Sequence, residues 1–486
     1  MIWRWPEAHP PDRPALRFER TRIRYGDLAC DAARAAASLA ARGVGRGDRV
    51  AFLGANHPAQ LALLFACARL GAMQVPLNWR LARPELSFIL RDSGAALLFA
   101  TREMLALGRA AAPEGCAVLD AESPWPDAAP PPPCGAEDDP VLLVYTSGTT
   151  GRPKGALLDQ RAIAANAANS RATHALTAAD RVLTVLPLFH VGGLNIQTTP
   201  ALMEGAEVLL HARFDPGVFL RACAEDRPTL SLLVPAVMRA LVAHPGWDAA
   251  ELTSLRAVGA GSSDIPPPLI EAFHARFIPV QQIYGATETG PIAIAQTRGE
   301  ALAAPGSIGR AAPLTEARIV DPAGIPVPPG RAGEIEVRGA NLARGYWRDA
   351  AATAAAFRDD GGWFRTGDVG RVDKQGRFWF TDRLKHVIIS GGENVYPAEV
   401  ERVLLTAPGV AEGAVCGRPD PRWGEVPVAV VVPGEGFDPA AVLRHFEGRL
   451  ARFKHPRAVV AVPALPRTAL GKVQLAELRS LAQRSE

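Results

Sequence analysis

A strand–helix–strand alternation between residues 48 and 77 is the feature that most restricts the fold of this chain. The stretch "RVAFLGA" (49–55) is typical of a buried strand and "AMQVPL" (72–77) of a second one, while apolar residues from Leu61 to Ala68 recur at helical spacing. The alternation continues through "LSFILRDSGAALLFA" and much of the next two hundred residues. It predicts an α/β fold built from βαβ units.

The last hundred residues follow a different pattern. Strands are predicted for "GRFWFTDR", "HVIISGG" and "EVPVAVVVP". A helix is predicted to start at Pro397, because proline suits the first helical turn, and another after Asp438 as its N-cap. These elements indicate a small α+β module that begins near residue 385.

Size and charge exclude several classes of protein. The chain has 486 residues, which is too long for one small core and indicates at least two domains. Its composition, 48% hydrophobic and 21% charged, is that of an ordinary soluble globular protein. A net charge of +3 is too small to suggest a nucleic-acid partner, so a polyanionic ligand would have to be bound by local groups.

The cysteines and the apolar stretches bear on the compartment. Six cysteines occur without a CxxC pair or zinc-type spacing, which fits a reducing environment. The N-terminus lacks the apolar core of a signal peptide, and the most apolar long stretch is interrupted by Arg69 and Gly71. We therefore expect a cytoplasmic protein without an integral membrane segment.

The stretch "YTSGTTGRPKGA" (145–156) combines three glycines, hydroxyl side chains and two cations. Glycines let backbone amides point at an anion, and hydroxyls and a lysine add donors, so the loop is suited to phosphate. It is not a Walker A motif, because Pro153 takes the place of the second glycine and Gly155 follows Lys154 where Ser or Thr is required. By itself, the loop could instead be a flexible surface hairpin.

Four further stretches favour a nucleotide site. In "YGATETG", the hydroxyl of Thr287 can bind phosphate and the carboxylate of Glu288 suits Mg²⁺. "WFRTGD" ends in Asp368, which can accept from both hydroxyls of a ribose. Arg383 and Lys472 follow in "DRLKHVIISGGEN" and "LPRTALGKVQ". Singly, Asp368 could be a structural cap and Lys472 a solvated charge, but the combination and order of the motifs weaken both alternatives.

In these motifs the chain resembles the superfamily of adenylate-forming enzymes, which includes acyl-CoA synthetases, adenylation domains of peptide synthetases and beetle luciferases. The resemblance covers about residues 20 to 480, and the motifs stand in family order. It implies an N-terminal AMP-binding and acyl-binding domain of βαβ subdomains plus a barrel (1–384) and a mobile C-terminal α+β domain (385–486), with the hinge at Lys385.

The resemblance also implies the cofactors and the residues that bind them. ATP and Mg²⁺ would take part in forming an acyl-adenylate, with Lys472, Thr287 and Glu288 as catalytic residues and Glu288 as the metal ligand. Tyr284 and the segment from Gly259 would enclose adenine, and Asp368 and Arg383 would fix the ribose. The residues implied to contact the nucleotide are Thr146, Ser147, Gly148, Thr149, Thr150, Gly151, Lys154, Gly259, Ala260, Gly261, Tyr284, Gly285, Asp368 and Arg383.

CoA is the favoured acceptor, because "RPDPRWGE" and "RFKHPR" resemble CoA-binding segments of aryl-CoA ligases such as 4-chlorobenzoate–CoA ligase. They would supply Trp423, Phe453 and Arg457, and Gly391 and Gly392 would leave room for the pantetheine arm. His455 stands where such a ligase has a second cation, and either aromatic residue could instead belong to the core.

The acid is only weakly encoded. "LPLFHVGGLNIQT" resembles the acyl-pocket segment, in which His190 would act as a gate, although a hydrogen-bonded core histidine is an equal alternative. Ile283 stands where malonate-activating relatives carry an arginine, which argues against a short dicarboxylate. We therefore expect an acyl-CoA synthetase for an aromatic or phenylpropanoid acid, with a medium- or long-chain fatty acid as the next choice.

Two alternatives and one open point remain. The enzyme could load a separate carrier protein, since no carrier motif follows Lys472, or the chain could be a non-catalytic nucleotide or acyl-CoA binding protein. The expected partners are the carboxylic acid, ATP and CoA. Many relatives form homodimers, but no feature of this sequence identifies such a surface.

Overall fold

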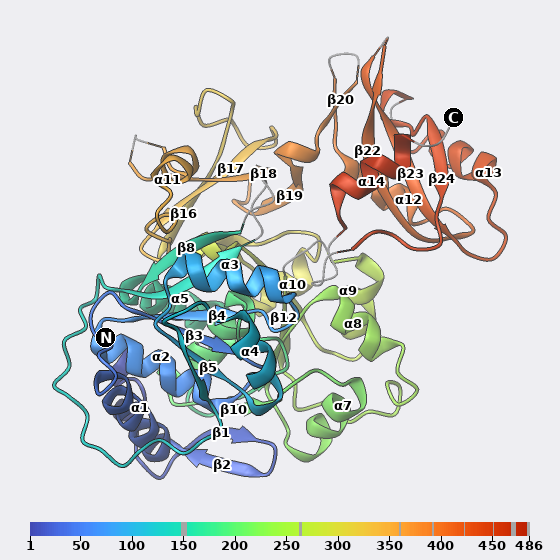
Figure 1. Cartoon of the computed structure of the whole chain (residues 1–486). Coiled ribbons are helices and arrows are strands. Elements are labelled where there is room, and N and C mark those ends of the chain that lie inside the picture. Colours follow the sequence, from blue (N-terminus) through green and yellow to red (C-terminus); the bar gives the residue numbers. More distant parts are fainter. Residues whose placement is uncertain are drawn as a thin grey trace. The chain divides into compact units, whose positions relative to one another are not determined.

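A computed structural model of the chain describes residues 1–146, 153–261, 265–358, 361–390, 393–421, 423–450, 452–467 and 473–483 (Figure 1). By compactness the chain divides into two units. The first comprises Met1–Ala317 and Val337–Phe364, and the second comprises Arg318–Glu336 and Arg365–Glu486. The predicted domain boundary after Leu384 is placed at a hinge, and not where the compact units meet. It stays a prediction.

The predicted βαβ unit is present. Strands β3 (Arg49–Leu53) and β4 (Met73–Leu77) pair in parallel and are joined by helix α2 (Pro58–Leu70). The helix starts with proline at its first position and ends at Gly71, whose φ of 68° is the left-handed conformation that favours glycine. Nearly every residue of α2 is buried, which explains its apolar character on all sides.

This unit belongs to a six-stranded sheet in the order β6–β5–β3–β4–β7–β8. The last two strands form an antiparallel hairpin, and the others run parallel to their neighbours. The remaining strands are β6 (Ala117–Asp120), β5 (Leu97–Ala100), β7 (Pro140–Thr146) and β8 (Lys154–Asp159). The helices associated with this part of the chain are α1 (Tyr25–Ala40), α3 (Arg83–Ser93) and α4 (Leu105–Ala111).

A nine-stranded sheet, in the order β15–β14–β13–β12–β11–β9–β10–β1–β2, forms the rest of the first unit. The six strands from β13 to β1 in that order are parallel to one another, so their carboxyl ends lie at one edge. The strands are β1 (Pro14–Phe18), β2 (Thr21–Arg24), β9 (Arg181–Thr184), β10 (Glu207–Leu210), β11 (Leu230–Leu233), β12 (Ala257–Gly261), β13 (Val280–Tyr284), β14 (Ile294–Ala295) and β15 (Arg310–Ala311).

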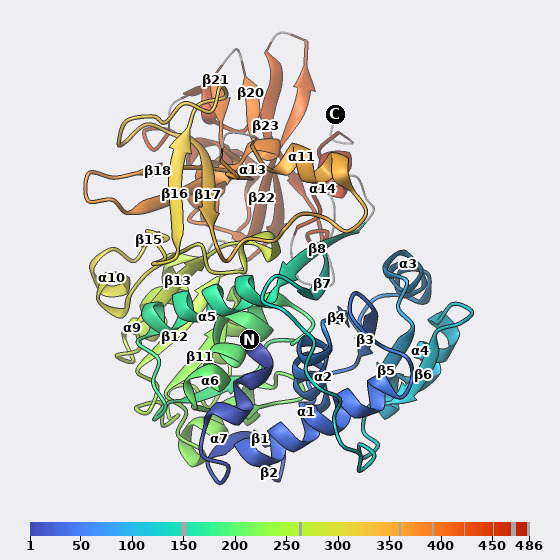
Figure 2. The same ribbon diagram turned by 90° about the vertical axis from the view of Figure 1, so that its left-hand side faces the viewer.

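Helices cover both faces of this sheet, as the continuous burial of its central strands requires. One apolar cluster joins alternate strand residues to α7 (Pro216–Glu225), α8 (Pro235–Val242) and α9 (Pro267–His274), drawn in green in Figure 1. A second cluster joins the other strand residues to α5 (Gln160–His174) and α6 (Thr199–Glu204), which lie along the sheet in Figure 2.

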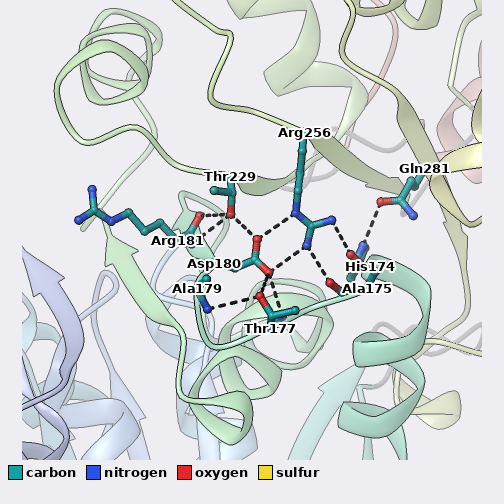
Figure 3. A network of polar contacts seen from close by, with 9 residues as sticks. All are labelled: His174, Ala175, Thr177, Ala179, Asp180, Arg181, Thr229, Arg256 and Gln281. Carbon is teal, nitrogen blue, oxygen red and sulfur yellow. Dashed lines mark hydrogen bonds and ion pairs between the residues drawn. The ribbon is translucent and has the colours of Figure 1, made fainter.

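A buried polar network holds the amino ends of three of these strands against the end of α5 (Figure 3). Asp180, just before β9, accepts from Arg256 Nε at 2.9 Å and from Thr229 Oγ1 at 2.6 Å. Arg256 also donates to the backbone oxygen of His174 at 2.7 Å. Burial opposes ionisation of Asp180, but the hydrogen bonds from Arg256 and Thr229 outweigh it and keep the pKa of this carboxyl below its ordinary value.

The second unit contains the predicted C-terminal elements. A five-stranded sheet has the order β21–β20–β23–β22, with β24 paired to β23. Helix α12 (Pro397–Leu404) starts at the predicted proline, and Asp438 caps α13 (Pro439–Arg444) by accepting from Ala440 N at 2.9 Å. Its other elements are β20 (Ile388–Ser390), β21 (Glu393–Val395), β22 (Val410–Asp420), β23 (Gly424–Pro433), β24 (Ala458–Ala461) and α14 (Leu475–Gln483).

The α/β class, with a large N-terminal and a small C-terminal domain, is confirmed. A fourth sheet has four strands in the open order β16–β17–β18–β19. The barrel that the resemblance implies stays a prediction. The strands of this fourth sheet are β16 (Thr315–Val320), β17 (Gly333–Gly339), β18 (Phe364–Val372) and β19 (Phe378–Arg383). Helix α11 (Ala350–Ala356) lies between β17 and β18 in the sequence.

None of the helices in the described ranges combines the length and the hydropathy needed to cross a membrane.

Candidate functional site

Part of the predicted site lies outside the residues that the structure describes. The residues concerned are Ser147, Gly148, Thr149, Thr150, Gly151, Gly391, Gly392 and Lys472. Lys385 is in the short helix Leu384–His386, but its side chain is not described. The geometry below therefore comes from the remaining predicted residues and from their neighbours.

The two ends of the glycine-rich loop are fixed in the hairpin of β7 and β8. Thr146 is the last residue of β7 and Lys154 the first of β8, and the two are opposite each other in the antiparallel register. The Thr146 hydroxyl donates to the Lys154 backbone oxygen at 3.4 Å. The seven residues between these strands (147–153) therefore connect the two arms of an antiparallel hairpin, which fits either interpretation of the loop.

The carboxyl ends of β12 and β13 bring several predicted residues together. Gly261 ends β12 and pairs in parallel with Ile283, and Tyr284 ends β13. A Cβ on Gly261 would collide with the backbone oxygen of Ile283, so only glycine fits there. Thr287 and Glu288 follow in the short helix Thr287–Thr289. The carboxyl edge of a parallel sheet is where α/β proteins commonly bind ligands.

Glu288 is held by a residue that the sequence did not single out. The phenol of Tyr346 donates a hydrogen bond of 2.7 Å to Glu288 Oε1, and the backbone N–H of Ala343 donates to the Glu288 backbone oxygen at 2.8 Å. Burial, and after it the negative charge of Glu288, raises the pKa of the Tyr346 phenol far above its ordinary value. Tyr346 therefore remains protonated and acts as a donor.

The segment that carries Tyr346 also reaches β8, which follows the glycine-rich loop. Trp347 N donates to Gly155 O at 2.7 Å and Leu157 N to Gly345 O at 3.0 Å, so residues 344–347 run along β8. Lys154 Nζ lies 5.5 Å from the centroid of the Tyr346 ring, within the range of a cation–π contact.

Asp349 is the second residue that the sequence reading missed. Its Oδ1 caps α11 by accepting from Ala352 N at 2.8 Å, while its Oδ2 lies 3.9 Å from Lys154 Nζ. Lys154, Tyr346 and Glu288 are thus neighbours, and Asp349 lies beside the lysine. The only sequence signal was the Gly-Tyr-Trp run at 345–347, which by itself indicates no chemistry.

The predicted ribose pair is brought together in the second unit. Asp368 on β18 stands opposite Arg383 on β19, and Arg383 Nε lies 3.2 Å from Asp368 Oδ1. The side chain of Asp368 is 10% exposed, whereas that of Arg383 is 46% exposed. The largely buried Asp368 carboxylate is thus paired with a cation whose own side chain reaches solvent.

His190 and the predicted acyl wall lie in one buried segment. His190 is half-buried and precedes the π-helix η4 (Gly192–Thr198), whose residues are all buried. The backbone oxygen of His190 accepts from Leu194 N at 3.0 Å. This places the histidine beside the segment it was predicted to gate, and its role stays a prediction.

The predicted CoA-contacting residues lie at the surface of the second unit. Trp423 is 39% exposed and Phe453 36% exposed, and Arg457 is also exposed, so neither aromatic is a core residue. His455 is half-buried, and its Nε2 lies 2.9 Å from the Leu450 backbone oxygen.

The side chains around Glu288 indicate how a metal ion could be bound. Within the described ranges, no group of three or more His, Cys, Asp and Glu side chains is arranged to hold a metal ion. Glu288 is a lone carboxylate, and within those ranges its Oε2 has no hydrogen-bond or ion-pair partner. One carboxylate oxygen completed by water and substrate phosphates is a common way to bind Mg²⁺.

Two protein families match the chain. The family "AMP-binding enzyme" matches residues 2–347, and "AMP-binding enzyme C-terminal domain" matches residues 399–472.

Two curated relatives and one solved structure span the same length. The chain is 48% identical to an indoleacetate–CoA ligase from Aromatoleum aromaticum over 99% of this chain and 98% of the relative. It is 45% identical to a feruloyl-CoA synthase from Amycolatopsis sp over 96% of each. Its fold matches o-succinylbenzoate CoA synthetase from Bacillus subtilis, solved with its acyl-adenylate intermediate, with a TM-score of 0.89 and 31% identity over 98% of this chain and 97% of that one. The chain therefore belongs to the AMP-binding enzyme family.

Proposed function

We propose that this protein is an ATP-dependent acyl-CoA synthetase that activates an aromatic carboxylic acid as acyl-AMP and transfers the acyl group to CoA. The observation that carries the proposal is the full-length identity of 48% and 45% to ligases that join an aromatic acid to CoA. The cluster of Lys154, Tyr346 and Glu288 at the sheet edge supports it.

The first half-reaction forms the acyl-adenylate. A carboxylate oxygen of the acid attacks the α-phosphorus of ATP, the bond to the β-phosphate oxygen breaks, and pyrophosphate leaves. A carboxylic acid with a pKa near ~4 is ionised at pH 7, so this step needs no general base. It needs in-line positioning and stabilisation of negative charge.

Lys154 and the loop from Thr146 would hold the β- and γ-phosphates. The 3.9 Å separation of Lys154 Nζ from Asp349 Oδ2 leaves room for a phosphate oxygen to compete for the ammonium group. Thr287 would contact the α-phosphate. Tyr284 and the β12 end at Gly261 would enclose adenine, and Asp368 and Arg383 would fix the ribose.

Glu288 would hold Mg²⁺ through Oε2, since Oε1 already accepts from Tyr346. When bound, the ion would neutralise charge on the phosphates. Tyr346 would keep the carboxylate in one orientation through its hydrogen bond to Oε1. Tyr346 is thus a positioning residue in this proposal.

The second half-reaction transfers the acyl group. The CoA sulfur attacks the acyl carbon, the carbon–oxygen bond to AMP breaks, and the thiol proton passes to solvent. In the first half-reaction, Lys472 would reduce the repulsion between the carboxylate of the acid and the α-phosphate of ATP. A rotation of the C-terminal domain at Lys385 would then withdraw Lys472 and bring Gly391 and Gly392 to the active site. Trp423, Phe453 and Arg457 would meet the nucleotide end of CoA, for which their exposure is suitable.

The test is a panel of acids assayed for CoA-dependent AMP formation and for the acyl-CoA product. Indole-3-acetate and ferulate should be consumed faster than octanoate and palmitate, as the 48% and 45% identity to an indoleacetate–CoA ligase and a feruloyl-CoA synthase suggests. Malonate should also be consumed slowly, because Ile283 cannot pair with a second carboxylate. Equal rates for aromatic and fatty acids would contradict the aromatic preference. Pyrophosphate release without CoA-dependent AMP formation would instead favour transfer to a carrier protein.

A cytoplasmic location and a homodimer also stay proposals. The first is supported by six cysteines with no disulfide in the described residues, and cell fractionation would test it. The homodimer is supported only by the fact that many members of the family form dimers, and analytical ultracentrifugation of the purified protein would test it.

A further inference from the structure

The buried segment that follows His190 contains an amide whose hydrogen bonds are not satisfied. Residues Gly192–Thr198 form a π-helix, a rare conformation that often marks functional positions. The segment is fixed from several sides. Ser170 Oγ donates to Ile196 O at 2.5 Å and Asn166 Nδ2 to Asn195 O at 2.6 Å. Thr198 Oγ1 donates to Gly193 O at 2.6 Å.

Two side-chain amides of this segment have unsatisfied atoms within the described part of the chain: Asn195 lacks a partner only at Nδ2, since its Oδ1 accepts from Thr199 Oγ1 at 3.2 Å, whereas Gln197 lacks partners at both atoms. The Gln197 side chain is buried, with 2% of the residue exposed, and neither Oε1 nor Nε2 has a hydrogen-bond partner among the described residues. Of the buried side-chain amides in the described ranges, Gln197 alone has both polar atoms unsatisfied. Burying an amide in this way costs free energy, so such a group calls for an external partner.

The amide lies at the edge of the sheet that carries the candidate site. Gln197 Nε2 is 3.3 Å from the place where a Cβ on Gly259 would lie, and Leu232 Cδ1 and Ile283 Cδ1 approach the same place to 3.1 and 2.9 Å. Gly259, Leu232 and Ile283 are all within the last three residues of the parallel strands β12, β11 and β13. The amide is therefore close to the carboxyl ends that lead to Tyr284 and Glu288.

A small cavity adjoins the amide. Its volume is about 10 Å³, and its lining includes Gln197, Gly193, Thr184, Leu186 and Leu232. This is the space of one water molecule or of one polar group of a ligand. A ring is larger than this space, so a ligand whose ring reached the amide would have to displace neighbouring side chains such as Leu232.

We propose that Gln197 is a specificity-determining residue that hydrogen-bonds a polar group on the ring of the acid, such as an N–H or O–H. Oε1 would accept from the donor, and Nε2 could donate to a neighbouring oxygen. The inference rests on the proposed function, since it concerns the acid that the ligase activates. A site built to bond a polar group discriminates against an analogue that lacks it, because the protein group is then buried without a partner.

The experiment uses pairs of acids that differ in one donor: indole-3-acetate with benzofuran-3-acetate, and 4-hydroxycinnamate with cinnamate. The wild-type enzyme should favour the donor acid of at least one pair by about tenfold or more in kcat/KM. In Gln197→Met, a substitution of similar shape without the amide, this ratio should fall towards one.

The control is Gln74→Met, the same change at a buried amide of β4 whose Nε2 donates to Gln60 O at 2.7 Å. This variant should keep the wild-type ratio even if its stability falls. If Gln197→Met does not fold, Gln197→Asn shortens the side chain and should also lower the ratio.

The outcomes separate the two ideas. An active Gln197 variant with an unchanged ratio for both pairs would overturn the inference and would indicate that the amide binds only an internal water. A wild-type enzyme that forms no acyl-CoA from any aromatic acid would overturn the proposed function instead.

Discussion

The Tyr346 phenol donates a hydrogen bond of 2.7 Å to Glu288 Oε1, between residues 58 positions apart in the sequence. The same tyrosine lies beside Lys154, whose Nζ is 5.5 Å from its ring centroid. One side chain thus connects the proposed metal carboxylate with the proposed phosphate lysine.

Tyr346→Phe removes this hydrogen bond and leaves the ring in place. We expect a loss of about tenfold in kcat/KM for ATP and a higher half-saturating Mg²⁺ concentration, because Glu288 can then rotate away from the ion. Steady-state kinetics at varied Mg²⁺ measure both. Glu288→Gln, which removes the charge itself, should cost about 10²–10³ in rate.

Tyr25→Phe is the matched control for this change. The buried Tyr25 hydroxyl donates to Ala206 O at 2.8 Å in the core of the first unit. Its loss should lower stability and leave the Mg²⁺ dependence unaltered. If both variants shift the Mg²⁺ dependence equally, Tyr346 has no positioning role.

Asp368→Asn tests the ribose pair. The carboxylate beside Arg383 should accept from both ribose hydroxyls, so the variant should raise the KM for ATP by about tenfold and leave the KM for the acid unchanged. Asp373→Asn is the control in the same hairpin, where Asp373 Oδ2 accepts from Arg377 Nε at 2.9 Å and Trp379 Nε1 at 3.1 Å. Asp373→Asn should lower stability without a selective change in the KM for ATP. If it raised this KM as much as Asp368→Asn does, Asp368 would have no specific role in binding the ribose.

His174 should make stability depend on pH. Its Nδ1 donates to Gln281 Oε1 at 3.2 Å, because the Gln281 amide nitrogen already donates to Thr173 O and Gln296 O. Burial lowers the pKa of His174 from 6.5 to about 4. Between these values the unfolded chain binds a proton there and the folded protein does not, so the stabilisation present above pH 6.5 is lost as the pH falls towards 4.

The corresponding measurement is urea unfolding at several values of pH. The gap between pKa values of 6.5 and about 4 corresponds to about 3 kcal/mol. His174→Asn keeps a donor for Gln281 but cannot take up a proton, so its free energy of unfolding should fall less steeply over this range. Thr229→Val, which removes the 2.6 Å bond to Asp180, should be less stable but keep the wild-type slope. An unchanged slope in His174→Asn would show that the histidine does not contribute.

Lys472→Ala tests the change of role between the two half-reactions. We expect it to abolish acyl-AMP formation and to spare thioester formation from supplied acyl-AMP. Lys454→Ala, which breaks a 2.7 Å ion pair with Glu399 elsewhere in the C-terminal part, should affect neither half selectively. Lys385→Pro should slow the second half more than the first by stiffening the proposed hinge. Equal losses in both halves for Lys472→Ala would refute this division of labour.

Local patterns explain what the sequence could predict. The βαβ unit at 49–77 follows from apolar spacing, and the starts of α12 and α13 follow from Pro397 and Asp438, whose effects are confined to one helical turn. The pairing of Asp368 with Arg383 could also be anticipated, because one antiparallel hairpin carries both.

The remaining site features depend on tertiary packing. Tyr346 and Asp349 reach Glu288 and Lys154 only because residues 344–347 run along β8, which no local pattern encodes. The unsatisfied amide of Gln197 likewise results from how the π-helix packs over Gly259. A glutamine in an apolar run carries no sign of its partners before the chain is folded.

The most direct test of the central claim is isotope exchange between pyrophosphate and ATP, measured with purified enzyme, Mg²⁺ and indole-3-acetate or ferulate in the absence of CoA. The account predicts exchange that depends on the acid, and its replacement by AMP and acyl-CoA formation when CoA is added. No exchange with any carboxylic acid, from an enzyme that is folded and binds ATP, would contradict it.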